Sequence, residues 1–235
     1  LGDTARLPYG TKSAQTVTRY AAQAAAALAR HGVKCLVVAC NTAASVGLDA
    51  MRAQVGGLPV IGVIEPGAQA ACAATVSGHI GVIATEATVR GGAYERAILE
   101  RRGDARVRQL ATQLLVALAE EGLVEGPVAQ GVVNHYLGPL FAQDPPDTLV
   151  LGCTHFPVLA PAIREAVGPN VRIVDSALTT AATVREQLLA AGIARAAGSQ
   201  SLQFIATDGP ERFARVGSRF LGRTIEARRI ELIDL

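Results

Sequence analysis

Two segments of similar design decide the fold. Residues 36–42 read Leu-Val-Val-Ala-Cys-Asn-Thr, and residues 149–155 read Leu-Val-Leu-Gly-Cys-Thr-His. In each segment an apolar run leads through a small residue to a cysteine and then to hydrogen-bonding side chains. Apolar runs without polar alternation are typical of parallel strands that are buried on both faces. We therefore interpret both segments as a strand followed by a helix, with Cys40 and Cys153 where the strands end.

The same alternation of apolar runs and helical patterns extends along the chain. Together with the two segments above, the predicted strands span residues 34–39, 59–64, 79–84, 148–152, 172–174 and 202–206. Helical patterns span residues 13–30, 42–54, 66–74, 88–102, 155–167, 176–191 and 210–220. Strands that alternate with helices of this length indicate βαβ units and parallel sheet. The predicted fold is therefore α/β, with two similar domains, each a mostly parallel sheet flanked by helices, and an active site in the cleft between them.

The domain division follows from the order of these elements. We assign residues 1–84 and about 203–235 to the first domain and residues 85–202 to the second, with approximate boundaries. Residues 112–142 are mostly helical but are interrupted by glycine and proline, so we interpret them as an interdomain region. The sequence begins without Met, and its first residues resemble the end of a strand followed by a loop. We therefore expect the N-terminal strand of the first domain to be missing from it.

The composition argues against several classes of protein. Half of the 235 residues are apolar and the formal net charge is only +2, which argues against a protein that coats nucleic acid or a membrane surface. No apolar run reaches the ~18 residues that a spanning helix needs, and the first residues lack a secretory signal pattern. Four scattered cysteines are too few for a disulfide framework. We expect a cytoplasmic protein whose partner is a small molecule, and the sequence leaves a homodimer open.

The two cysteines at strand ends are candidates for chemistry. Ligands of open parallel sheets bind beyond the carboxyl ends of the strands, and a helix start there lowers a thiol pKa through its free N–H groups and its dipole. Cys40 and Cys153 could thus face each other across one cleft. The alternatives are a buried structural role, which we assign to Cys35 and Cys72, and a zinc site that includes His155. Because the spacing lacks the local ligand pairs of zinc sites, we expect no metal.

Four motifs carry a resemblance to a known family. They are Gly-Asp-Thr-Ala-Arg-Leu-Pro-Tyr-Gly at residues 2–10, Ala-Cys-Asn-Thr-Ala at 39–43, Gly-Val-Ile-Glu-Pro at 62–66 and Gly-Cys-Thr-His-Phe-Pro at 152–157. In this order they resemble the glutamate racemases of the aspartate/glutamate racemase superfamily, and the likeness covers essentially the whole chain. The resemblance implies a cofactor-independent, two-base racemisation of glutamate that supplies the D-isomer for bacterial peptidoglycan.

The resemblance also implies roles for individual residues. Cys40 and Cys153 match the two acid/base cysteines of the family. Auxiliary acidic and imidazole groups near the thiols are matched by Asp3, Glu120 and His155. Substrate-binding positions are matched by Pro8, Tyr9, Gly10, Asn41, Thr42, Thr85, Thr88, Thr154 and His155. The family's N-terminal strand and its Asp-Ser-Gly-x-Gly-Gly loop have no counterpart in the sequence.

Other functions stay open at this point. A racemase of the same superfamily could act on aspartate or a related acid, and a protein of this fold could bind an amino acid without catalysis. A pyridoxal mechanism needs a Schiff-base lysine. The two lysines, Lys12 and Lys34, lie in the first turn of a predicted helix and at the entry of a predicted strand. Neither position is the carboxyl end of a strand, which favours direct proton transfer by the thiols.

Overall fold

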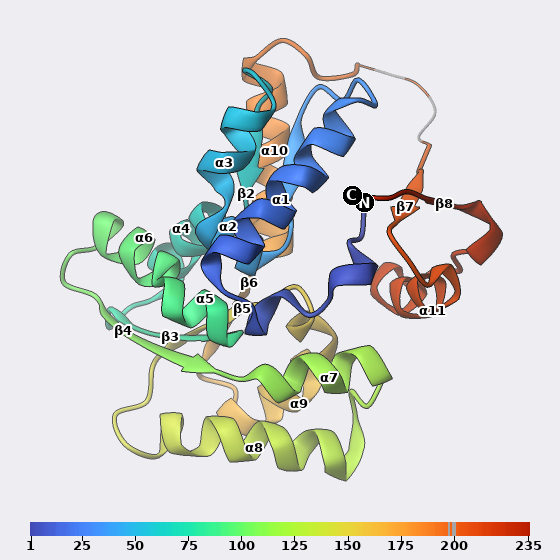
Figure 1. The fold of residues 1–235 in the computed structure, drawn as a ribbon. Helices are drawn as coiled ribbons and strands as arrows, with labels where there is room; N and C mark the ends of the chain where they lie inside the picture. The colour runs from blue at the N-terminus through green and yellow to red at the C-terminus, as the bar shows by residue number, and fades with distance from the viewer. Residues whose placement is uncertain (197, 199–200) are drawn as a thin grey trace.

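In the computed structural model, which describes residues 1–196, 198 and 201–235, the strands form three parallel sheets (Figure 1). The first sheet pairs β1 (Leu36–Val38) with β2 (Val60–Gly62). The largest has four strands in the order β4 (Arg106–Ala111), β3 (His79–Ala84), β5 (Thr148–Gly152) and β6 (Arg172–Asp175). The third pairs β7 (Phe204–Ala206) with β8 (Ile230–Leu232). The predicted α/β class, with parallel sheets flanked by helices, is confirmed.

Helices connect the strands. They are α1 (Ala14–Ala29), α2 (Asn41–Val46), α3 (Leu48–Gln54), α4 (Ile64–Ala74), α5 (Glu86–Gly91), α6 (Ala93–Arg101), α7 (Gln113–Glu121), α8 (Gly126–Ala142), α9 (Ala160–Val167), α10 (Ser176–Ala190) and α11 (Pro210–Leu221). Ser13 caps α1, because its hydroxyl accepts the N–H of Thr16 at 3.3 Å. Thr85 caps α5 through the N–H of Thr88, also at 3.3 Å, so this helix begins before residue 88. Among the described helices, none combines the length and the apolar content needed to cross a membrane.

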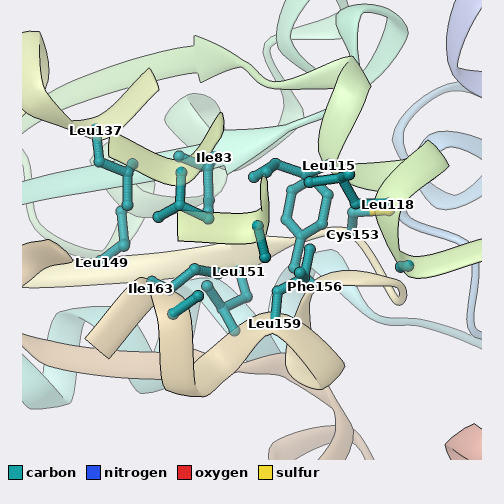
Figure 2. Packing of buried hydrophobic residues seen from close by; sticks show 14 of the residues in the cluster. Ile83, Leu115, Leu118, Leu137, Leu149, Leu151, Cys153, Phe156, Leu159 and Ile163 are labelled. Carbon is teal, nitrogen blue, oxygen red and sulfur yellow. The ribbon is translucent and has the colours of Figure 1, made fainter. Parts of the chain in front are cut away.

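The central strands β3 and β5 are buried along their whole length. On one face of the sheet, Ile83 and Leu151 pack against α7, α8 and α9, and on the other face Val82 and Val150 pack against α4 and α6. Figure 2 shows the first of these clusters, with Cys153 at its edge. Because both faces are covered, the carboxyl ends of β3 and β5 are held rigidly in place.

Three details differ from the sequence-based expectations. Strand β4 was not predicted because it alternates arginine and glutamine with apolar residues, as an edge strand does when one face is exposed. Strand β8 was also missed, since a glutamate interrupts its Ile-Glu-Leu sequence and two of its residues are exposed. The third detail concerns residues 112–142, which we interpreted as an interdomain region. They form α7 and α8, which pack against the four-stranded sheet.

Strand pairing also bears on the domain boundaries. β3 pairs with β4 and β5, so residues 79–84, which we assigned to the first domain, belong to the four-stranded sheet. At the other end of the chain, Gly2 forms a parallel bridge with Ala206. Figure 1 shows β7, β8 and α11 as a lobe beside the N-terminal segment, with the two termini close together. This bridge joins residues 203–235 to the beginning of the chain, and the remaining bounds of the two domains stay a prediction.

Candidate active site

One cavity, of about 920 Å³, collects most of the predicted site residues beyond the carboxyl ends of β1, β3 and β5. The predicted residues that line it are Asp3, Pro8, Tyr9, Gly10, Cys40, Asn41, Thr42, Thr85, Glu120, Cys153, Thr154 and His155. Thr88 is the exception, because it is fully buried behind the lining residues. Both cysteines therefore face one space, at the edge where parallel sheets bind ligands.

Cys40 lies two residues after β1 and caps α2. Its Sγ accepts a hydrogen bond from the N–H of Ala43 at 3.5 Å. Burial raises the pKa of the Cys40 thiol, while the N–H groups of Ala43 and Thr42 and the Thr42 hydroxyl act in the opposite direction. The balance favours the neutral thiol, because desolvation is the largest of these effects.

Cys153 directly follows β5 and is more deeply buried than Cys40. Figure 2 shows it beside Leu115 and Leu118 of α7. Burial raises the pKa of Cys153 to about 12; the charges of Cys40 and Glu120 add to this rise, and hydrogen bonds to the residues that follow Cys153 oppose it. No α-helix starts at this point, because Phe156–Leu159 forms a 3₁₀ turn before α9.

The expected lowering of both thiol pKa values is therefore wrong. The sequence pattern places donors at each thiol, but it does not reveal how far the surrounding apolar side chains exclude water. Desolvation of the thiolate outweighs the donors at both positions. Both thiols belong to residues that line the same cavity.

Three threonine hydroxyls form a closed triangle beside Cys40. The Oγ1 atoms of Thr42 and Thr85 lie 2.8 Å apart, those of Thr42 and Thr88 lie 3.1 Å apart, and those of Thr85 and Thr88 lie 2.9 Å apart. Thr42 and Thr85 line the cavity, whereas Thr88 supports them from behind. The triangle joins α2 to α5 and holds two hydroxyls toward the cavity in fixed positions.

Asn41 offers a hydrogen-bond donor from the same side. Its Oδ1 accepts the hydroxyl proton of Tyr94 at 2.7 Å, whereas its buried Nδ2 has no partner among the described residues. A buried donor without a partner is destabilising by about 1–3 kcal/mol. Because Asn41 also lines the cavity, a bound anion or carbonyl oxygen would satisfy this N–H group.

A chain of polar contacts leads away from Cys153. The Sγ of Cys153 lies 3.8 Å from Nδ1 of His155, and Nε2 of His155 lies 2.6 Å from Oε1 of Glu120. Arg212 donates to Oε2 of Glu120 at 3.1 Å. The hydrogen bond with His155 is the main cause that lowers the pKa of Glu120, and Arg212 contributes in the same direction. An ionised Glu120 accepts the proton of Nε2, which leaves Nδ1 as an acceptor that faces the thiol.

Asp3 has different contacts from Glu120. Its Oδ2 accepts from Arg6 Nε at 2.7 Å and from the Tyr9 hydroxyl, and its Oδ1 accepts from the Thr207 hydroxyl at 3.0 Å. Within the described residues it forms no hydrogen bond with either thiol. The pKa of the Tyr9 phenol is raised by burial, by its hydrogen bond to Asp3 and by the charges of Asp3 and Cys40.

The loop at Gly10 fits closely against the end of the four-stranded sheet. A Cβ atom at Gly10 would lie 2.7 Å from Oε1 of Gln113 and 2.7 Å from Cβ of Thr85, so only glycine fits without a shift. Gln113 also lines the cavity, and its Oε1 is buried without a partner among the described residues. Sequence reasoning missed Gln113 because it missed β4, whose end places Gln113 here.

Arg212 is the second residue that sequence reasoning missed. It lies on α11, and its contact with Glu120 depends on how the C-terminal lobe packs, for which a lone arginine in a helical pattern gives no signal. The alternative of a metal centre was considered for Cys40, Cys153 and His155. No group of three or more His, Cys, Asp or Glu side chains within the described ranges is arranged to hold a metal ion.

Comparisons with known proteins identify the family of this chain. The family model for Asp/Glu/Hydantoin racemases matches residues 2–184. The glutamate racemase of Neisseria meningitidis is 46% identical over 235 residues, which are 100% of this chain and 86% of the relative.

Two solved structures are similar to this chain over nearly its whole length. Glutamate racemase from Francisella tularensis, in complex with D-glutamate, has a TM-score of 0.92 and 31% identity, with 99% of this chain and 86% of that chain covered. The enzyme from Thermus thermophilus, in complex with beta-chloro-D-alanine, has a TM-score of 0.86 and 39% identity, with 100% and 85% covered. The chain belongs to the Asp/Glu/Hydantoin racemase family and is a racemase.

Proposed function

We propose that this racemase interconverts L- and D-glutamate by proton transfer between Cys40 and Cys153. The observation that carries the proposal is that both strand-end thiols line one cavity. The similarity to enzymes named glutamate racemase, at 46% identity over the full chain, supports glutamate as the substrate. Glutamate would lie between the two sulfurs, with one face of its α-carbon toward each of them.

The reaction needs one thiolate and one thiol. The thiolate removes the α-hydrogen from one face of the amino acid, and the electron pair of the broken C–H bond moves into the α-carboxylate. The other thiol donates its proton to the opposite face and becomes the thiolate. The product has the opposite configuration, and the two cysteines have exchanged protonation states. Holding both sulfurs in contact with the α-carbon supplies the proximity that such a transfer requires.

The cavity contains donors suited to the developing charge. The Asn41 Nδ2 group has no partner among the residues that the structure describes, and the hydroxyls of Thr42 and Thr85 are held by their triangle with Thr88. Fixed donors of this kind stabilise negative charge on a carboxylate without reorganisation. Thr154, which lines the cavity beside Cys153, adds a hydroxyl on the other side.

The raised thiol pKa values fit a substrate-assisted ionisation. Burial disfavours the charged forms of both thiols and so favours the neutral ones. The ammonium group of a bound amino acid brings a positive charge beside the sulfurs, and a nearby positive charge lowers a thiol pKa. On the Cys153 side, His155 Nδ1 lies 3.8 Å from the sulfur and can receive the thiol proton.

The two lysines do not take part in this scheme. Lys12 donates from Nζ to the carbonyl oxygen of Pro8 at 2.9 Å, and Lys34 donates from Nζ to the carbonyl oxygen of Ile193. Neither lysine is among the residues that line the cavity. The proposed proton transfer is therefore carried by cysteine side chains, without a lysine-bound cofactor.

The proposed biological role is the supply of D-glutamate for bacterial peptidoglycan, in the cytoplasm. Support for the role comes from the bacterial glutamate racemases that this chain resembles. Support for the location comes from the chemistry, because a proton exchange between Cys40 and Cys153 requires both thiols to remain reduced. All four cysteines of the chain are free, as is usual in a reducing compartment.

A substrate panel tests the proposed function. The full-length protein is incubated separately with both enantiomers of glutamate, aspartate and alanine, and racemisation is followed by circular dichroism. We expect turnover of both glutamate enantiomers and far slower turnover of the other amino acids. Faster turnover of aspartate would instead assign an aspartate racemase. Protection of Cys40 and Cys153 from alkylation by glutamate, without any turnover, would assign a binding protein.

A further inference from the structure

The C-terminal helix α11 contacts the His155–Glu120 pair, which lies beside Cys153, at three points. Arg212 donates to Glu120 Oε2 at 3.1 Å, and Arg219 donates to the backbone oxygen of Glu120 at 3.4 Å. The ring of Phe220 packs edge-on against His155, with 5.5 Å between the ring centroids. A helix far along the chain from the cysteines therefore touches both members of the His155–Glu120 pair.

Each carboxylate oxygen of Glu120 has one partner, Arg212 for one oxygen and His155 for the other. Oε2 is bound by Arg212, and Oε1 lies 2.6 Å from His155 Nε2. The side chain of Glu120 is only 16% exposed, whereas that of Arg212 is 55% exposed. The carboxylate is therefore held in one orientation by a positive charge at the surface, while its other oxygen points inward to the imidazole.

This arrangement determines which nitrogen of His155 faces the thiol as an acceptor. With Glu120 ionised, Nε2 carries the proton and Nδ1 presents a lone pair to Cys153. The titratable and charged side chains that contact the pair are Cys153 and Arg212, whereas Arg219 meets the backbone of Glu120 and Glu121 lines the same cavity. Among the described residues, the groups that lower the pKa of Cys40 are the amides of Thr42 and Ala43 and the Thr42 hydroxyl, all from α2.

We propose that Arg212 is a positioning residue that orients the Glu120–His155 pair and so primes Cys153, but not Cys40, for removal of the α-hydrogen. This inference rests on the proposed function and deepens it. It assigns the C-terminal lobe a task in one half of the reaction, although Arg212 need not contact the amino acid.

Single-cysteine variants allow the removal of the α-hydrogen by Cys153 and by Cys40 to be measured separately. Cys40→Ala leaves Cys153 as the remaining base, and Cys153→Ala leaves Cys40. In each background the exchange of the α-hydrogen of L- and D-glutamate with deuterium from the solvent is measured by NMR. Arg212→Gln is added to both backgrounds. The matched control is Arg215→Gln, which removes an exposed arginine of the same helix that has no contact with Glu120 among the described residues.

We expect Arg212→Gln to slow the exchange that depends on Cys153 by about three- to fivefold, the size expected for one partly exposed ion pair. The exchange that depends on Cys40 and both Arg215→Gln controls should change by less than about twofold. The acid limb of the Cys153-dependent pH profile should move to higher pH, because loss of the positive charge raises the pKa of Glu120. Arg212→Lys should restore most of the rate.

Equal slowing in both backgrounds would overturn the inference and indicate a structural or direct binding role for Arg212. An unchanged rate and pH profile in the Cys153-dependent background would overturn it as well. If neither single-cysteine variant exchanges hydrogen measurably, the primary isotope effect with α-deuterated glutamate is compared between Arg212→Gln and the parent enzyme. An increase for one enantiomer only supports the inference, and equal changes refute it. Racemisation of glutamate by the parent enzyme shows separately whether the proposed function holds.

Discussion

The two sides of the cavity are built on similar sequence segments but differ in their proton-handling groups. Cys40 is half-buried and lies among backbone amides and the Thr42 hydroxyl. Cys153 is buried at the edge of an apolar cluster and faces the imidazole of His155, which Glu120 holds. The strand-end motif thus sets the positions of the thiols, whereas their acid/base environments depend on residues that arrive from other elements.

Each side of the cavity also has a carboxylate, and the two carboxylates have different partners. Between Cys153 and Glu120 stands the imidazole of His155, which can accept a proton at one nitrogen while it donates from the other. Asp3 instead accepts the hydroxyl proton of Tyr9, whose pKa is raised above its usual value. The imidazole can pass a proton between the thiol and the carboxylate, whereas the contact of Asp3 orients a neutral hydroxyl.

The largest expected effect is on the cysteines themselves. Cys40→Ala and Cys153→Ala should each reduce racemisation by about 10²–10⁴-fold or more, since each removes one of the two acid/base groups. Each variant should still exchange the α-hydrogen of one enantiomer, and the two variants should prefer opposite enantiomers. Cys35→Ala and Cys72→Ala serve as controls, because neither residue lines the cavity. Normal racemisation by either active-site variant would refute the two-base assignment.

The carboxylates provide the next test of the difference between the two sides. Glu120→Gln keeps the shape of the side chain but removes the charge that fixes His155. We expect about a tenfold decrease in kcat, within the range for a group that supports acid/base catalysis, and a changed pH profile. Asp3→Asn should leave the shape of the pH profile unchanged, because this carboxylate forms no hydrogen bond with either thiol among the described residues. Equal effects of the two substitutions on the profile would contradict the account.

The thiol pKa values predict the pH dependence of the unmodified enzyme. Both are raised by burial, so the neutral form of each thiol is the main form at neutral pH. Raising the pH increases the fraction with one thiolate, and kcat/KM for glutamate should rise by up to about tenfold per pH unit over this limb. Activity should fall again once both thiols ionise. A rate that decreases steadily from pH 6 to pH 9 would be incompatible with these thiols as the bases.

The smallest effect concerns the support of Asn41. Tyr94→Phe removes the hydroxyl that donates to Asn41 Oδ1 and leaves this buried oxygen without its partner. The free energy of unfolding should decrease by about 1–2 kcal/mol, as measured by urea denaturation, and KM for glutamate should rise more than kcat falls. Tyr20→Phe is a matched control, because the Tyr20 hydroxyl has no hydrogen bond to the described residues. Equal destabilisation by both substitutions would remove the role assigned to Tyr94.

The central strands and the pair of cysteines could be predicted from the sequence, because both depend on local patterns. Buried strands such as β3 and β5 appear as continuous apolar runs, and the motifs at their ends lead to one edge of the sheet. Edge strand β4 could not be recognised in this way, since its alternating polar residues resemble a surface segment. Because β4 was not predicted, Gln113, which follows its end, was not recognised as a cavity residue.

The contacts that distinguish the two thiols could not be predicted. The ion pair between Arg212 and Glu120 joins residues 92 positions apart, and its formation depends on the placement of the C-terminal lobe. The direction of the thiol pKa shifts depends on how completely apolar side chains surround each sulfur. A helix start beside a cysteine indicates available donors, but only the packed structure shows that desolvation exceeds their effect.

The central claim is tested most directly by racemisation of L-glutamate in D₂O at low conversion, with the deuterium content of both enantiomers measured by mass spectrometry. Two bases on opposite faces predict that the D-glutamate formed carries deuterium at the α-carbon while the unreacted L-glutamate keeps its hydrogen. Transfer by a single base would contradict the account. It would be recognised by either of two results: the D-glutamate formed retains the original hydrogen, or deuterium appears equally in both enantiomers.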